Sequence, residues 1–132
     1  MCDTWYYTYI MRIFKYRPFN RWAKDLKLDD LVLSKMIREL EKGLYNANLG
    51  GGVYKKRIAI GKRGKRDGIR TIVAFKAADR AIFMYGYAKN EKSNISELEK
   101  EALKKLAKAY FSYSENQLYK AVEHNELVEI II

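Results

Sequence analysis

The feature that most constrains this chain is a central block in which polar and apolar residues alternate along three short segments. The segments cover residues 53–60, 69–76 and 80–87 and are rich in β-branched and aromatic side chains. Alternation with a period of two is typical of strands that bury one face. The connections at 61–68 and 77–79 are short. The block therefore predicts a meander of three antiparallel strands.

The residues before the meander indicate one strand and two helices. Residues 11–14 form a short apolar run ahead of Pro18, a residue that suits the first turn of a helix. Asp29 is placed to cap a second helix, because apolar residues follow at helical spacing over 33–44. We expect the glycine run 50–52 to form the turn from this helix into the meander.

Two helices and a closing strand are expected after the meander. Each helix begins with a capping box, in which a serine and the third residue after it satisfy each other's backbone N–H groups. The boxes pair Ser96 with Glu99 and Ser114 with Gln117, and they open helices over 96–111 and 114–124. Residues 127–132 form the last apolar run and predict a strand.

The order of these elements predicts an α+β fold. The order is β-α-α-β-β-β-α-α-β, which indicates a small, mainly antiparallel sheet with helices packed on one face. The chain has 132 residues, of which 48% are hydrophobic, and this suits a single domain with its own core. We expect that domain to cover 11–132 and leave 1–10 as an N-terminal extension of unassigned role.

Rare residue types exclude several classes of protein. The single cysteine, Cys2, cannot form an internal disulfide, and with the single histidine, His124, it cannot build a Cys/His zinc cluster. No apolar run approaches the roughly 20 residues that span a bilayer. We therefore expect a cytoplasmic protein that takes no metal or cofactor and has no membrane partner.

The positive charge is concentrated in the middle of the chain. The net charge is +10, and residues 55–92 carry 12 Lys and Arg against 3 Asp and Glu, a balance of +9. A basic stretch of this density is the footprint expected of a surface that binds a phosphate backbone. An acidic protein partner, or simply a solvated face, is the alternative.

Strand alternation decides which basic side chains act together. Lys55 and Arg57 point to one face of the first meander strand, and Arg70 lies opposite the apolar set of the second. We expect these three and Lys89, which follows the third strand, to converge on one open face. Further RNA contacts are expected from Lys56, Lys62, Arg63, Lys65, Arg66 and Lys92, with Tyr85 and Tyr87 stacking on bases or packing in the core.

Such a cluster suffices for one kind of phosphoryl transfer. RNA carries its own nucleophile, the 2′-OH, so a protein cleaves it by aligning that oxygen and stabilising charge on phosphorus. A metal-dependent nuclease needs several carboxylates at one site. The basic segment offers only Asp67, Asp79 and Glu91. The composition therefore favours RNA cleavage without metal.

Four segments of the chain resemble RelE/HigB-type toxins of bacterial type II toxin–antitoxin modules. The segments are 48–60, 68–76, 79–83 and 85–95, and the similarity runs from residue 11 to the C-terminus. The resemblance implies a small antiparallel sheet with helices and cleavage of messenger RNA on the ribosome without metal. It also implies a co-encoded antitoxin, often of the helix-turn-helix type.

The resemblance also implies roles for individual residues. Lys55 and Arg57 match the basic pair of the family's Tyr-Lys-x-Lys strand, and Arg70 matches the arginine of its Gly-Tyr-Arg strand start. Lys89 matches the lysine of the loop after the meander. Arg57 and Arg70 are then expected to bind phosphate charge, and Lys55 or Lys89 to transfer a proton.

Two positions depart from the family pattern. Asn90 stands where RelE has a second loop arginine, and Ile95 and Ser96 stand where RelE has its catalytic tyrosine. The identity of base and acid therefore does not transfer. Two alternatives to an endoribonuclease remain: a non-nucleolytic toxin like the ParE branch, which poisons DNA gyrase, and a degenerate phage-derived protein that retains only antitoxin binding.

Overall fold

The structure, a computed structural model, describes residues 11–58 and 68–131, and within them the chain forms six strands and four helices. The strands are β1 Arg12–Tyr16, β2 Ala47–Gly50, β3 Val53–Ile58, β4 Ile69–Lys76, β5 Arg80–Ala88 and β6 Leu127–Ile130. The helices are α2 Arg17–Asp25, α3 Asp30–Glu41, α4 Glu97–Phe111 and α5 Glu115–Glu123. Among the helices of these residues, none is both long and apolar enough to cross a membrane.

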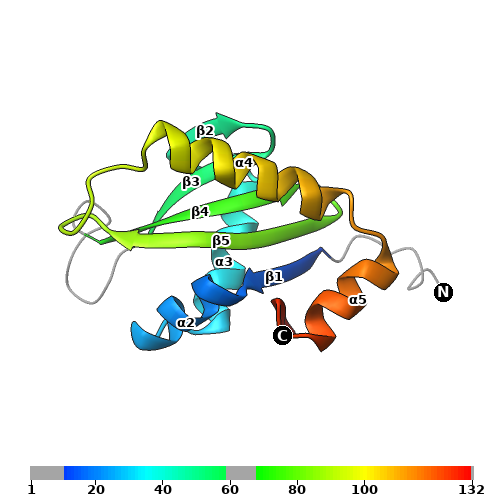
Figure 1. The fold of residues 1–132 in the computed structure, drawn as a ribbon. Coiled ribbons are helices and arrows are strands. Elements are labelled where there is room, and N and C mark those ends of the chain that lie inside the picture. The colour runs from blue at the N-terminus through cyan, green and yellow to red at the C-terminus, as the bar shows by residue number, and fades with distance from the viewer. Residues whose placement is uncertain (1–10, 59–67, 132) are drawn as a thin grey trace.

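All six strands belong to one sheet, in the order β2-β3-β4-β5-β1-β6. The pair β1 and β5 is parallel, and the other described pairs are antiparallel. In Figure 1, α4 runs along one side of the sheet, and α2 and α3 lie on the other. The structure confirms the α+β class, the mainly antiparallel sheet and the three-strand meander β3-β4-β5.

One detail of the expected fold is wrong, because helices cover both faces of the sheet. One core cluster joins Ile72 and Ala74 of β4 to residues of α4 and α5, and a second joins Ile69 and Val73 of the same strand to residues of α2 and α3. The first six residues of β4 are all buried. A central strand that is apolar on both faces exposes one of them to water unless helices pack on each side.

The strand β2 was not expected from the sequence. Helix α3 ends at Glu41, and the chain then forms β2, which pairs antiparallel with β3. The glycines at 50–52 all have positive φ and make the turn of this hairpin, instead of a turn from helix to strand. The turn lies close under α4, because a Cβ at Gly52 would lie 2.7 Å from the ring of Phe111. A strand of four residues gains its stability from pairing with β3, and its sequence, Ala-Asn-Leu-Gly, lacks the β-branched residues typical of strands.

A β-bulge in β5 changes which of its side chains face α4. Ile72 lies opposite Tyr85 and Val73 lies opposite Phe83, so Met84 is an extra residue between the two pairs. Before the bulge, Phe83 belongs to the cluster on the α2 and α3 side. After it, Tyr85 and Tyr87 belong to the α4 side, since one inserted residue reverses the alternation.

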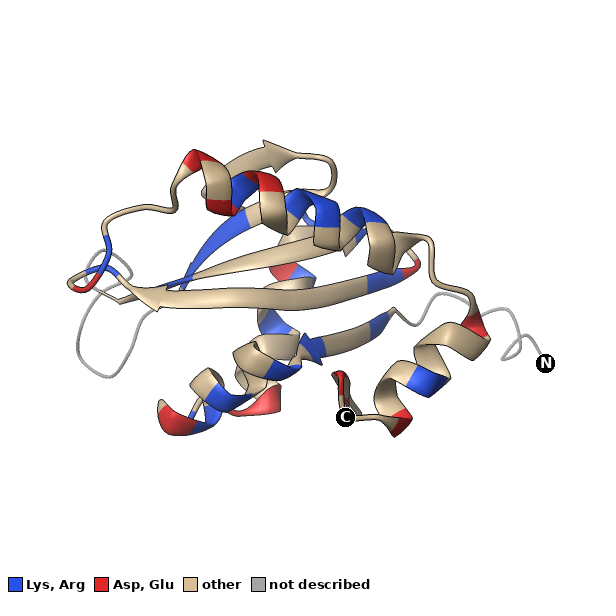
Figure 2. Ribbon diagram, viewed as in Figure 1, with Lys and Arg blue, Asp and Glu red and all other residues tan. Residues whose placement is uncertain are grey.

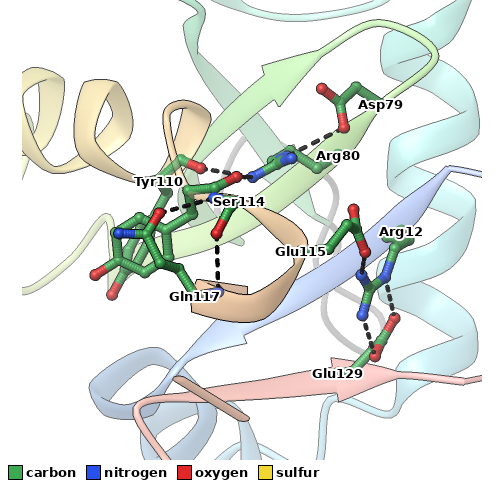
Figure 3. A network of polar contacts seen from close by, with 9 residues as sticks. Arg12, Asp79, Arg80, Tyr110, Ser114, Glu115, Gln117 and Glu129 are labelled. Atoms are coloured by element: carbon green, nitrogen blue, oxygen red, sulfur yellow. Dashed lines mark hydrogen bonds and ion pairs between the residues drawn. The ribbon is translucent and has the colours of Figure 1, made fainter. Parts of the chain in front are cut away.

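The C-terminal end of α4 is fixed to the sheet by Arg80 of β5 (Figure 3). The buried guanidinium donates hydrogen bonds from Nη1 to the carbonyl oxygens of Tyr110 at 2.9 Å and Tyr113 at 2.8 Å, and from Nε to Asp79 at 3.1 Å. These bonds satisfy carbonyls that a helix end leaves without partners. Arg80, one of the 12 central basic residues, is therefore used for structure.

Candidate active site

Three polar side chains lie side by side across the meander. Arg57 of β3 is paired with Arg70 of β4, and Arg70 is paired with Tyr87 of β5. Directly opposed residues in a sheet have Cβ atoms about 4.5–5.5 Å apart and share a face. We call Arg57, Arg70 and Tyr87 the cross-strand row. It lies on the side of the sheet that α4 covers, at the end of the meander near the start of that helix (Figure 1).

Local contacts hold the row in place. Arg70 is only 3% exposed, and its Nη1 donates to the carbonyl oxygen of Gly68 at 3.4 Å. The backbone N–H of Arg57 donates to the side-chain oxygen of Asn46, just before β2, at 2.8 Å. The guanidinium Nε of Arg57 is buried and has no hydrogen-bond partner. The β2–β3 hairpin therefore fixes the backbone at Arg57 while leaving a donor of its side chain unused.

The row is strongly cationic. Guanidinium groups stay charged in proteins, and like charges directly opposite each other in a sheet are unfavourable. Lys55 adds a third cation on the same face, and its pKa is lowered by partial burial and by the charges of Arg57 and Arg70. No acidic side chain forms an ion pair with Lys55 or Arg57 within the described residues. An anion bound among these groups would relieve their repulsion.

The tyrosines of β5 form the other side of the site. The rings of Tyr85 and Tyr87 lie 5.8 Å apart with an interplanar angle of 32°. Tyr87 is 5% exposed and its hydroxyl has no hydrogen-bond partner, whereas the Tyr85 hydroxyl accepts a hydrogen bond from Lys92 Nζ at 3.5 Å. Burial raises the pKa of Tyr87, although Arg70 and Lys92 act in the opposite direction. Tyr87 is therefore a buried, neutral phenol beside two cations.

An acidic residue also reaches the site, and sequence reasoning missed it. Glu99, in the first turn of α4, forms an ion pair with Lys92, whose Nζ lies 5.6 Å from the centre of the Tyr85 ring. The hydrogen bond from Lys92 and that from the backbone N–H of Ser96 lower the pKa of Glu99 to about 2. The capping box was visible in the sequence, but the contact of its glutamate with Lys92 depends on where α4 lies.

The remaining expected site residues lie elsewhere or outside the described residues. Lys56 is buried on the opposite face, where its Nζ pairs with Glu39 of α3 at 2.6 Å, because one step along a strand reverses the face. Lys56 is therefore on the other side of the sheet from Lys55, Arg57 and Arg70, and its expected RNA contact stays a prediction. Lys89 is exposed in the turn after β5. The connection that holds Lys62, Arg63, Lys65 and Arg66 is not among the described residues.

A second group of lysines, on α4, was also missed. Lys104, Lys105 and Lys108 line a hollow of about 450 Å³ together with Lys76 and the turn at Gly51. Figure 2 shows basic residues along α4 as well as on the meander. Residues 97–111 hold 3 Glu and 4 Lys, so their net charge in the sequence is only +1. The glutamates lie near the start of the helix, and most of the lysines lie further along. The basic surface is therefore apparent only when the two ends of the helix are considered separately.

The fold and this site together define a class of protein: a small α+β domain whose meander presents clustered arginine, lysine and tyrosine beside the start of a helix. A family model described as the RelE toxin of the RelE / RelB toxin–antitoxin system matches residues 11–130. The chain therefore belongs to the RelE toxin family and is a toxin of a toxin–antitoxin system, which implies an antitoxin partner. Comparisons with curated proteins and with solved structures find no match.

Proposed function

We propose that this toxin is a metal-independent endoribonuclease that cleaves messenger RNA on the ribosome and thereby stops translation. The observation that carries the proposal is the opposition of Arg57 and Arg70 across β3 and β4, with Lys55 on the same face. RelE family toxins are generally ribonucleases. A helix-turn-helix antitoxin is the expected partner, and a cytoplasmic location follows from the ribosomal substrate.

The chemistry needs no group beyond the protein and the RNA. A base removes the proton of the 2′-OH, the O2′–P bond forms, the P–O5′ bond breaks, and an acid gives a proton to O5′. The products are a 2′,3′-cyclic phosphate and a 5′-OH. In our proposal Arg57 and Arg70 stabilise the negative charge that grows on the non-bridging oxygens. Lys55 or Lys89 transfers a proton.

The test separates chemistry from binding at Arg70. Arg70→Ala should lower the rate of single-turnover cleavage on programmed ribosomes by about 10²-fold or more, as loss of one oxyanion donor does, with a much smaller loss of ribosome affinity. Arg70→Lys should also be slow, because an ammonium does not reproduce the planar fork of the guanidinium. Arg38→Ala, on the exposed side of α3, is the matched control and should cleave like the wild type.

Two results would contradict the proposal. Equal, small effects of Arg70→Ala and Arg38→Ala would remove Arg70 from the reaction. A wild-type protein that cuts no RNA but inhibits DNA supercoiling by gyrase would belong to the non-nucleolytic branch instead. Thermal unfolding of each variant shows whether a loss of cleavage reflects a loss of folded protein.

A further inference from the structure

Orphaned polar atoms are concentrated in the cross-strand row. In the part of the chain that the structure describes, three buried side-chain atoms have no hydrogen-bond partner: Asn20 Oδ1, Arg57 Nε and Tyr87 Oη. Two of the three belong to the row, on either side of Arg70. A buried polar group without a partner is destabilising, and a cluster of them in a folded protein needs an explanation. A bound ligand that supplies the missing partners is the simplest one.

The two orphaned atoms of the row, Arg57 Nε and Tyr87 Oη, can both donate a hydrogen bond to the same kind of ligand. Arg57 Nε–H is a donor and never an acceptor. Arg70 and Lys92, the cations that act on Tyr87, are also donors only, so neither can accept a hydrogen bond from its hydroxyl. Burial raises the pKa of Tyr87, so the phenol keeps its proton at neutral pH and remains a donor. With Arg70 between them, these donors fit a group with several negatively charged oxygens. A phosphodiester is such a group.

Charged side chains at the surface lie beside the row. Lys92 lies over the Tyr85 ring, and its ion pair with Glu99 joins two partly exposed side chains. Exposed ion pairs contribute little to stability and open readily. A phosphate that approaches Lys92 competes with Glu99 for the same ammonium group. Lys92 and Glu99 both act electrostatically on Tyr87, so this pair lies beside the end of the row that holds it.

We propose that the Tyr87 hydroxyl donates a hydrogen bond to a non-bridging oxygen of the scissile phosphate, beside Arg57 and Arg70. The inference rests on the proposed endoribonuclease function and adds a catalytic residue to it. Tyr87 keeps its proton throughout, so the O2′–P bond forms and the P–O5′ bond breaks as described above, with proton transfer left to other groups. The hydrogen bond strengthens as the oxygen gains charge, and so it accelerates the reaction more than it tightens binding.

The experiment uses Tyr87→Phe, which removes one oxygen atom and keeps the ring. We expect single-turnover cleavage on programmed ribosomes to fall by about 10²-fold, with ribosome affinity unchanged. The melting temperature of the isolated variant should stay the same or rise, because an unsatisfied buried hydroxyl is lost. The pH dependence of the rate should keep the shape of the wild-type curve. Tyr119→Phe, at a tyrosine 64% exposed on α5, is the control and should change none of these.

Each other outcome overturns the inference in a distinguishable way. If Tyr87→Phe cleaves RNA as fast as the wild type does, the proposed role of Tyr87 is wrong and the proposed endoribonuclease function stands. A lower melting temperature that accounts for the lost activity would make the hydroxyl structural. A changed pH profile would make it a proton-transfer group. Absence of cleavage by the wild type would overturn the proposed function and this inference together.

Discussion

The ionisation of Lys55 is set by its partial burial and by two neighbouring arginines. Its pKa is lowered, first by burial and then by Arg57 and Arg70, so the folded protein disfavours the charged ammonium. The unfolded chain therefore binds this proton more tightly than the folded chain does. Stability is reduced by this effect at neutral pH, and it recovers as pH rises through the folded pKa of Lys55 toward 10.5.

We therefore expect Lys55→Met to raise the melting temperature at neutral pH while it lowers cleavage. The gain should shrink as pH rises, because the wild-type lysine then loses the charge that repels the arginines. Thermal unfolding across the pH range measures both effects. The control is Lys35→Met at an exposed position of α3, which should give no such pH-dependent difference. A melting temperature that falls at neutral pH would show that Lys55 is held by a favourable contact.

At the scale of elements, the close packing of β5 against α2 fixes the strand that carries the two site tyrosines. Gly86 lies between Tyr85 and Tyr87 and faces the other side of the sheet, where a Cβ would lie 2.1 Å from the ring of Trp22. A rigid indole cannot move aside without shifting α2. Overpacking of this kind typically costs about 1–3 kcal/mol.

Gly86→Ala is therefore expected to lower the free energy of unfolding by roughly 1–3 kcal/mol. Because β5 or α2 must shift, cleavage should also fall, although the substitution lies on the face away from the cross-strand row. Denaturant unfolding and single-turnover cleavage measure the two effects. Unchanged stability would mean that the Trp22 side chain has room to rotate away from the strand.

Much at this scale was predictable from local signals, and two features were missed. The capping boxes at Ser96 and Ser114 placed the starts of α4 and α5, because a cap is a local hydrogen-bond pattern. Alternation placed Lys55 and Arg57 on one face, because residues two apart in a strand share a face. The strand β2 was not predicted, because its four residues lack the β-branched side chains typical of strands. The cover on both faces of β4 was missed although Ile72, Val73 and Ala74 form an apolar run that occupies both faces.

Some features of the candidate site could also be predicted from local sequence, and others could not. That Lys55, Arg57 and Arg70 lie together follows from strand alternation and from the meander, both of which are local. That Glu99 reaches Lys92 depends on the path of α4 over the sheet, and the sequence contains no signal for it. The missing partner of the Tyr87 hydroxyl is likewise a property of the assembled core, visible only once every neighbour is in position.

At the scale of the whole molecule, the net charge of +10 predicts strongly salt-dependent binding. Each phosphate that a basic side chain neutralises releases counterions, so the logarithm of ribosome affinity should fall linearly with the logarithm of salt concentration. Arg57→Gln should reduce this slope by about one. Arg38→Gln, on the far face of the sheet, should leave it unchanged. A flat salt dependence of the wild type would show that the basic face is not the contact surface.

The bulge in β5 decides which of its side chains lies opposite the arginine of β4. If Met84 paired with Ile72 in a regular strand, the tyrosines would keep their order, but the second half of the strand would run one residue out of its present register. Gly86, which has no side chain, would then stand opposite the arginine of β4, and both phenols would turn toward α2 and α3. For this strand, the position of the bulge therefore matters as much as the identity of the side chains.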